Sequence, residues 1–412
     1  MLTSLNSHRD EEEGTHHHHP NHQILPHGLI APSTHSCQLL ISCAELIHRA
    51  DYSAARRILS LLSTICSPHG DSTDRLVHQF ARALSLRIDR VLTHLISSSM
   101  FSSNEDTIQS SSYLSLNKVT PFLRFAHLTA NQAILEAIDG RRSIHILDFD
   151  TSHGVQWPPF LQAMAERSDP SSLQSIRITG TGTDLDVLHR TGDRLQAFAN
   201  SLGLRFQFHP LYLPTTNPDA TTTSLNSSFQ LHPGETLAVN CILFLHKLLR
   251  DRTGDDPACK LVAFLHAVKA MNPVVVTVAE REATHNSPVF LRRFMEALDH
   301  YTAVFESLEA TLPPKSPERL EVEQVWLGRE IEDIVGREGE GRKERHERFE
   351  WWEGLMRDRG FSSLPLSPFA LSQAKLLLRL HYPSEGYQLQ MSKNSLFLGW
   401  QHKPLFSVSS WH

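Results

Sequence analysis

Residues 144–149 read Ile-His-Ile-Leu-Asp-Phe, which is a nearly continuous apolar run. Such a run predicts a strand buried on both faces, because a parallel strand covered by helices on both sides has no face toward water. Further apolar runs follow, separated by helical patterns, at 176–179, 205–208, 236–241 and 274–279. This alternation predicts a parallel sheet with right-handed helical crossovers.

The C-terminal part has a different order of predicted elements. We expect a strand at 303–308, a long helix at 329–358 and a second helix at 369–380. The apolar runs at 395–400 and 404–408 are so close in sequence that only an antiparallel pair can form. A parallel sheet that ends in an antiparallel strand is the outline of a class I methyltransferase. The predicted fold class is therefore α/β with a Rossmann-like core.

The N-terminal region predicts a tail followed by helices. Residues 1–36 combine an acidic run, prolines and a histidine tract (His16 to His19). They cannot bury enough apolar surface to offset the entropy of ordering, so we expect a disordered tail without a defined metal site. From Cys37 onward apolar residues recur at helical spacing, which predicts a small bundle of three short helices. Two polar stretches, 97–112 and 211–234, are predicted surface loops.

The composition leaves both an enzyme and a regulator open. The 412 residues carry a formal net charge of −6 at pH 7, which argues against avid, sequence-independent binding to nucleic-acid phosphates. The five cysteines form no CxxC pair, and this favours a reducing compartment such as the cytosol or nucleus. No apolar run is long enough to span a membrane.

The first predicted strand runs into the turn that would bind S-adenosylmethionine in a methyltransferase. Glycines in such a turn let the backbone approach the cofactor closely. Asp148 and Gly154 fit the glycine-rich pattern, whereas Asp150 and Ser152 stand where it has glycine. We expect Asp150 to crowd the turn and to repel the carboxylate of the cofactor. The second strand also lacks an acidic residue for the ribose hydroxyls until Asp184, so we interpret the cofactor site as lost.

Two carboxylates end predicted strands, where α/β enzymes place their active sites. Asp148 and Glu280 could form an acid–base pair, or they could fix the adjacent loops through hydrogen bonds, which is the favoured interpretation. His145 lies within the first strand and is interpreted as a hydrogen-bonded core residue. The sequence contains no GxSxG, HExxH or GxxxxGK[ST] motif.

Several motifs, in order along residues 37–412, resemble those of the GRAS family of plant transcriptional regulators. The first strand resembles Val-His-Ile-Ile-Asp, and HGVQWPPFLQAMAER follows it at 153–167. The flanking helical segments correspond to two leucine-rich regions, 272–313 resembles the Pro-Phe-Tyr-Arg-Glu region, and the chain end resembles Ser-Ala-Trp. The residues that carry these motifs are Ile144, His145, Ile146, Leu147, Asp148, Arg281, Glu282, Trp400, Ser409, Ser410 and Trp411.

Within this family the stretches 67–88, 120–137 and 369–390 most resemble the lateral suppressor branch. The resemblance implies a helical cap at 37–120 on a Rossmann-like core at 121–412. It implies a nuclear, non-enzymatic scaffold without a cofactor that promotes axillary meristem formation and shoot branching. The implied partners are other regulators, namely GRAS proteins including DELLA-type ones and DNA-binding transcription factors, in homo- or heterodimers. Direct DNA binding and, less favoured, methyl transfer stay as alternatives.

Two short motifs are candidate contact sites for partners. One of them is an LxxLL docking pattern formed by Leu245, Leu248 and Leu249. Leucines at helical spacing are, however, more often core residues. The other is a basic cluster of Arg342, Lys343, Arg345 and Arg348. This cluster could serve in nuclear import or phosphate binding. Glutamates interleave with this cluster, and their spacing favours an ion-paired helix face exposed to solvent instead.

Overall fold

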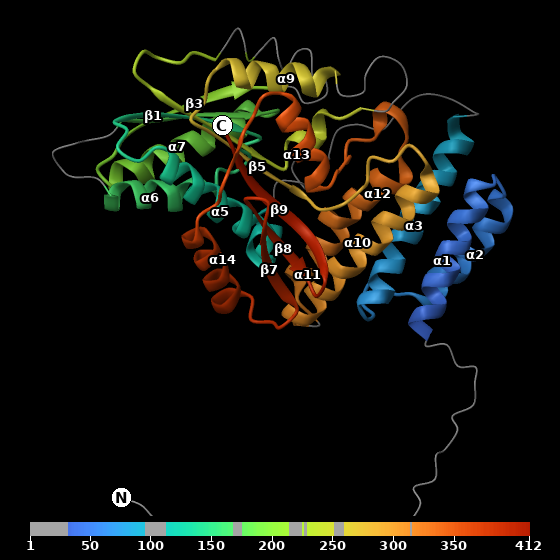
Figure 1. Cartoon of the computed structure of the whole chain (residues 1–412). Coiled ribbons are helices and arrows are strands. Elements are labelled where there is room, and N and C mark those ends of the chain that lie inside the picture. Colours follow the sequence, from blue (N-terminus) through green and yellow to red (C-terminus); the bar gives the residue numbers. More distant parts are fainter. Residues whose placement is uncertain are drawn as a thin grey trace, which may run out of the picture.

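The computed structural model describes residues 32–94, 113–167, 175–213, 225, 229–250, 259–313 and 315–412. Within these residues one sheet of nine strands is covered by helices on both faces (Figure 1). Its parallel half runs in the order β3 (Arg205–Tyr212), β2 (Ser175–Gly182), β1 (Ser143–Phe149), β4 (Thr236–Ile242) and β5 (Val275–Arg281). Its antiparallel half continues with β9 (Lys403–Trp411), β8 (Ser395–Trp400) and β7 (Tyr387–Ser392), and the short β6 (Ser363–Leu364) pairs with β9. The predicted α/β fold class is confirmed.

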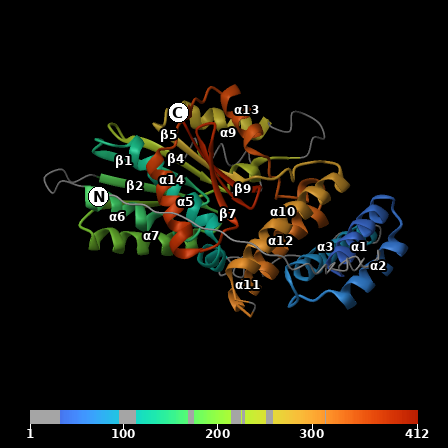
Figure 2. The same cartoon turned by 60° about the horizontal axis from the view of Figure 1, so that its bottom comes forward.

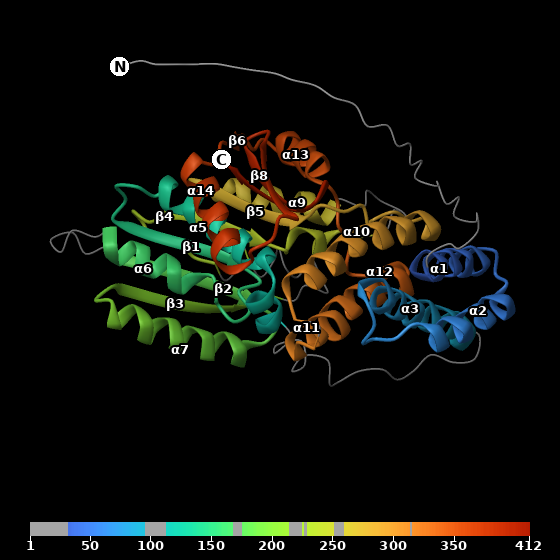
Figure 3. The same ribbon diagram turned by 90° about the horizontal axis from the view of Figure 1, so that it is seen from below.

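The burial of β1 shows how the two helical layers attach to the sheet. Every residue of the strand except the first is buried, as its apolar run predicts. Ile144 and Ile146 pack toward α5 (Pro121–Ala137), α6 (Trp157–Arg167) and α7 (Leu185–Ser201). Leu147 and Phe149 pack toward α9 (Cys259–Ala270) and α13 (Phe349–Asp358). Figure 3 shows α6 and α7 on one side of the sheet and α9 and α13 on the other.

The end of the chain runs through the middle of the sheet. β9 lies between β5 and β8 and is antiparallel to both, so that Trp411 pairs with Val276. The predicted antiparallel pair of C-terminal strands is confirmed, and Leu396, Leu398 and Trp400 are buried as the pairing requires. The predicted second helix is α14 (Pro368–His381), which packs against α5.

The cap is built from two distant parts of the chain (Figure 2). Its first part is α1 (Pro32–His48), α2 (Tyr52–Ile65) and α3 (Ser72–His94). Its second part, which packs on α3, is α10 (Phe290–Thr311), α11 (Pro317–Glu321), η2 (Val322–Leu327) and α12 (Gly328–Gly336). The buried Arg75 of α3 forms a bidentate ion pair with Glu323 of η2, at 2.7 and 3.1 Å. The cap therefore extends beyond the predicted 37–120, and its first helix begins five residues before Cys37.

Two predictions for the C-terminal part are wrong. The segment 303–308 lies inside α10, where Val304, Phe305 and Leu308 face the core at helical spacing. The predicted long helix ends at Gly336, since the glycine-rich stretch 339–341 forms only a 3₁₀ turn, η3 (Gly339–Gly341), before α13 begins. The histidine tract and the predicted loop at 97–112 lie outside the described residues, as does most of 211–234.

Two tryptophans of the C-terminal strands should carry much of the stability of the sheet. The side chains of Trp400 and Trp411 are 5% and 0% exposed. We expect Trp400→Ala and Trp411→Ala each to lower the free energy of unfolding by about 3–5 kcal/mol. Phe369→Ala on α14, where the ring is 57% exposed, is the control and should change the value by less than about 0.5 kcal/mol. Denaturant titrations that gave both tryptophan variants the wild-type midpoint would contradict this assignment.

Candidate functional site

A crevice opens at the carboxyl ends of the parallel strands. The strand order reverses between β1 and β4, and ligands of open α/β sheets bind outside the strand ends at such a point. A cavity of about 850 Å³ lies there, lined by the turn after β1, the ends of β2 and β4, and η1 (Leu245–Leu248). Trp326 of the cap borders the same cavity, so core and cap share it.

The turn after β1 keeps the backbone conformation that glycine favours. Asp150, Ser152 and Gly154 have φ angles of +62°, +49° and +63°, in the left-handed region. The carboxylate of Asp150 forms an ion pair with Lys247 of η1, and both side chains line the cavity. Gly154 is required by close packing, since a Cβ there would lie 2.6 Å from the Thr191 methyl group. The turn therefore combines left-handed backbone angles with a charged side chain at Asp150.

The residues of the crevice do not fit S-adenosylmethionine. Asp150 adds a carboxylate on the wall of the cavity that would face the anionic end of the cofactor. The end of β2 reads Thr-Gly-Thr at 181–183 and offers no carboxylate for ribose hydroxyls. Asp184 is committed to α7, because its Oδ1 accepts a hydrogen bond from the Val187 amide at 3.0 Å. The interpretation of a lost cofactor site agrees with these contacts.

Asp148 ties β1 to its neighbours rather than facing the cavity as a free acid. Its carboxylate accepts hydrogen bonds from Trp157 Nε1 at 2.8 Å and from Asn240 Nδ2 at 2.7 Å. Burial raises the pKa of Asp148 to about 6, against the lowering effect of these donors. Gln156 extends the network by bonding Asn240 and Asn131. These contacts support the interpretation of Asp148 as a loop-fixing carboxylate.

Glu280, at the end of β5, has a similar task. Its carboxylate accepts hydrogen bonds from the Leu245 amide at 2.8 Å and lies 2.7 Å from His246 Nδ1. Glu280 therefore holds the start of η1 against the sheet. His145 is fully buried in β1, with its Nε2 at 2.8 Å from Thr179 Oγ1, and burial lowers its pKa to about 4. The interpretation of His145 as a hydrogen-bonded core residue is confirmed.

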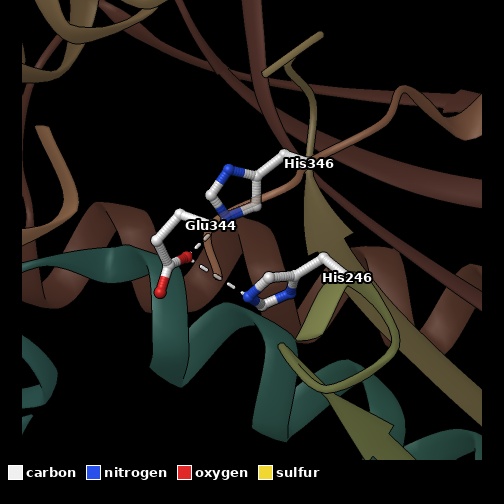
Figure 4. Close-up of side chains that lie close together, drawn as sticks. All are labelled: His246, Glu344 and His346. Atoms are coloured by element: carbon white, nitrogen blue, oxygen red, sulfur yellow. Dashed lines mark ion pairs between the residues drawn. The ribbon is translucent and has the colours of Figure 1, made fainter. Parts of the chain in front are cut away.

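Three side chains that the sequence did not mark as a site meet at the border of the crevice (Figure 4). His246 comes from η1, and Glu344 and His346 come from the segment between α12 and α13. Glu344 Oε2 lies 3.3 Å from His246 Nε2 and 3.1 Å from His346 Nε2. The two parts of the chain are far apart in sequence, so no local motif spacing could have indicated this cluster.

The cluster holds strongly perturbed titratable groups. Burial alone would lower the pKa of His246, but Glu280 and Glu344 raise it to about 9. Burial lowers the pKa of His346 to about 4, and the neighbouring His246 adds to this effect. Burial would raise the pKa of Glu344, but the two histidines hold it well below its ordinary value. The protonation states of the three groups thus depend on one another and on their burial.

Comparison with known proteins identifies the family. The model of the GRAS domain family matches residues 36–412. The chain belongs to the GRAS domain family. It is 50% identical over 407 residues to Scarecrow-like protein 18 of Arabidopsis thaliana, covering 91% of this chain and 90% of that one. It is 52% identical over 405 residues to protein MONOCULM 1 of Oryza sativa subsp. japonica, covering 92% and 88%. The crystal structure of SCL7 from Oryza sativa shares the fold with a TM-score of 0.74 at 35% identity, covering 93% of this chain and all of that one.

These matches confirm the family, and with it the lateral suppressor branch that the motifs resemble. As a GRAS protein the chain is a transcriptional regulator. None of the helices in the described part of the chain is both long and apolar enough to cross a membrane.

The motif residues of this GRAS protein are all buried and act inside the fold. Arg281 forms an ion pair with Glu330 of α12, and its guanidinium lies 5.1 Å from the ring centre of Phe406. Glu282 accepts a hydrogen bond from the Phe349 amide at 3.1 Å, and burial raises its pKa to about 7. The family motifs therefore mark contacts between elements rather than an exposed binding surface.

The residues of both candidate contact sites are largely internal. Leu245, Leu248 and Leu249 are buried in the core beside α9, so they are no exposed docking motif. The basic cluster lies in the segment before α13 rather than on a helix. Its Arg342 and Arg345 are fully buried, where their guanidinium groups donate to the carbonyl oxygens of His285 and Gly339 at 2.6 and 2.7 Å. These two arginines therefore form neither a basic surface nor a helix face exposed to solvent.

The Asp148 contact predicts a pH-dependent loss of stability in Trp157→Phe. The variant removes the indole donor, which raises the pKa of Asp148 above its present value of about 6. A raised pKa favours the folded state only while the carboxyl is protonated, and this stability is lost as the pH rises through the folded pKa. The deficit in unfolding free energy against wild type should therefore grow between pH 5 and pH 8, by about 1–2 kcal/mol.

Urea titrations at the two pH values measure this difference. In an Asp148→Asn background the same Trp157→Phe change should give a deficit that does not vary with pH, because the titrating group is gone. A deficit of equal size at both pH values in the Asp148 background would show that Trp157 contributes packing alone.

Proposed function

We propose that this GRAS protein is a nuclear co-regulator that acts by binding other transcriptional regulators, and that it does not transfer methyl groups. The observation that carries this proposal is the ion pair between Asp150 and Lys247 in the crevice. It places a paired carboxylate on the cavity wall where a methyltransferase has a glycine. The polar groups of the crevice are used to join η1, the turn after β1 and the sheet, which suits a scaffold better than a catalyst.

The exposed face of α14 supports the role of a scaffold. Phe369, Leu376 and Leu380 are 57%, 45% and 62% exposed, at positions that share one side of the helix. Large apolar side chains gathered on a surface mark protein interaction sites. We propose that a DNA-binding transcription regulator docks on this face. The net charge of −6 and the burial of Arg342 and Arg345 make direct DNA binding the weaker alternative.

The biological role that we propose is the promotion of axillary meristem formation and shoot branching in the nucleus. It is supported by the likeness to the lateral suppressor branch and by the high identity to Scarecrow-like protein 18 and MONOCULM 1 over most of each chain. The comparisons themselves support only the coarser statement that the family consists of transcriptional regulators.

Calorimetry tests the absence of a cofactor site. We expect the full chain to show no saturable heat with S-adenosylmethionine or S-adenosylhomocysteine, because Asp150 and Ser152 replace the turn glycines and Asp184 caps α7. A double variant, Asp150→Gly with Ser152→Gly, restores the glycine pattern and is the matched comparison. Micromolar binding of S-adenosylmethionine by the wild-type chain would contradict the non-enzymatic proposal.

Expression in a plant line that lacks its own lateral suppressor protein tests the regulator role. A fluorescent fusion of the full chain should enter nuclei and restore axillary shoots. Leu376→Glu with Leu380→Glu should reach nuclei at the same level and restore fewer shoots, because the apolar face of α14 is lost. Lys375→Glu, on an exposed neighbouring residue, is the control and should behave as wild type. Full restoration by the double variant would exclude α14 as the docking face, and failure of the wild-type fusion would exclude the role in branching.

A further inference from the structure

The cluster of His246, Glu344 and His346 has the geometry of a metal site. The candidate ligand atoms, two imidazole Nε2 atoms and one carboxylate oxygen, all lie within 4.8 Å of one another. In a tetrahedral zinc site with Zn–N of about 2.0–2.1 Å and Zn–O of about 2.0–2.2 Å, neighbouring ligand atoms are about 3.3–3.5 Å apart. The distances from Glu344 Oε2 to the two Nε2 atoms, 3.3 and 3.1 Å, are close to this value.

We propose that His246, Glu344 and His346 bind one divalent transition-metal ion, and that this ion is zinc. Two imidazoles and a carboxylate are a ligand set that zinc accepts in proteins. The inference is independent of the proposed regulatory function, since it concerns how core and cap are joined.

The Nε2 atoms of both rings face Glu344. His246 and His346 are 2% and 1% exposed, and their Nε2 atoms lie 3.3 and 3.1 Å from Glu344 Oε2 without the geometry of a hydrogen bond. In the tautomer that binds a metal, the Nε2 lone pair faces a carboxylate oxygen and is repelled by it. A cation between the three atoms removes this repulsion.

The surroundings of the two histidines fit the same role. His246 Nδ1 lies 2.7 Å from Glu280 Oε2, and His346 Nδ1 lies 2.9 Å from His285 Nδ1. A hydrogen bond donated by Nδ1 leaves the lone pair on Nε2, and metal-binding histidines regularly have such a partner, often a carboxylate. The Glu280 carboxylate accepts and so orients His246, and His346 takes the same tautomer when its Nδ1 donates to His285.

The local charge also calls for a cation. The ion pairs Arg281–Glu330 and Lys247–Asp150 each cancel internally. Glu280 and Glu344 then place two carboxylates around His246, and they raise the pKa of this ring to about 9, so that its proton balances part of their charge. A divalent ion balances them without requiring protons on the rings. Because His246 and Glu344 also line the cavity, a fourth ligand position can open toward it.

The ion would join two distant segments. His246 belongs to η1 of the core, and Glu344 and His346 belong to the segment that leads from the cap back to α13. Binding of an ion to the folded chain alone raises its stability by mass action. The expected consequence is a zinc-dependent rise in melting temperature.

The test uses the full chain without an affinity tag. Because His16 to His19 could bind zinc by themselves, all measurements are made with these four residues replaced by alanine. Zinc content after dialysis and competition with a chromophoric chelator give stoichiometry and Kd. Cobalt(II) provides a second readout, since visible absorption bands of high intensity report tetrahedral coordination. We expect one ion per chain, a tetrahedral cobalt spectrum and a higher melting temperature with zinc.

Variants identify the ligands. Glu344→Gln and His346→Gln should each weaken binding more than about 100-fold and abolish the cobalt spectrum, and Glu280→Gln should weaken it about 10–100-fold. His145→Gln, which changes another buried histidine, should leave binding unchanged. If the folded wild-type chain binds neither ion, or if binding persists in Glu344→Gln with His346→Gln, the proposal is wrong and protons alone hold the cluster together. The cobalt spectrum of the wild-type chain decides the question even if a variant fails to fold.

Discussion

The strand β9 is the constraint on which the rest of the fold depends. It hydrogen-bonds to β5 on one side and to β8 on the other, so the parallel and antiparallel halves of the sheet meet only through it in the described structure. It also carries Phe406, whose ring stacks on Phe122 of α5 at 5.0 Å and lies beneath the guanidinium of Arg281. The last residues of the chain thus set the position of Glu280 and Arg281, from which both the crevice and the cap contacts are built.

The turn after β1 combines a backbone that glycine favours with residues other than glycine. The left-handed turn is retained at Asp150 and Ser152, although an L-residue in that region costs about 1 kcal/mol or more relative to glycine. Asp150 offsets part of this cost through its ion pair with Lys247 and through the hydrogen bond of its amide to Thr181 Oγ1 at 3.0 Å. The ion pair connects the turn after β1 to η1 across the cavity that both line.

The sequence predicted the strands well because buried parallel strands leave a local signal, as in the six buried residues of β1. The prediction of a strand at 303–308 is wrong because a short apolar run fits a strand and a buried helix equally well. Only the packing of α10 on α3 decides between them. The roles of Asp148 and His145 could be predicted because each sits at a defined place in one strand. The cluster of His246, Glu344 and His346 could not, since tertiary folding alone brings its two segments together.

Buried ionic contacts also explain why the cap holds one position on the core. Arg281–Glu330 joins β5 of the core to α12 of the cap, whereas Arg75–Glu323 joins α3 to η2, the two parts of the cap. Apolar residues of similar volume often give equal or greater stability than buried ion pairs, so stability alone does not account for them. Apolar packing is non-directional, whereas a bidentate guanidinium–carboxylate contact fixes both distance and orientation. The bidentate Arg75–Glu323 pair therefore fixes the two parts of the cap to each other, and Arg281–Glu330 ties the cap to β5. The cap side of the shared crevice, which includes Trp326 and Glu330, is thereby held against the core.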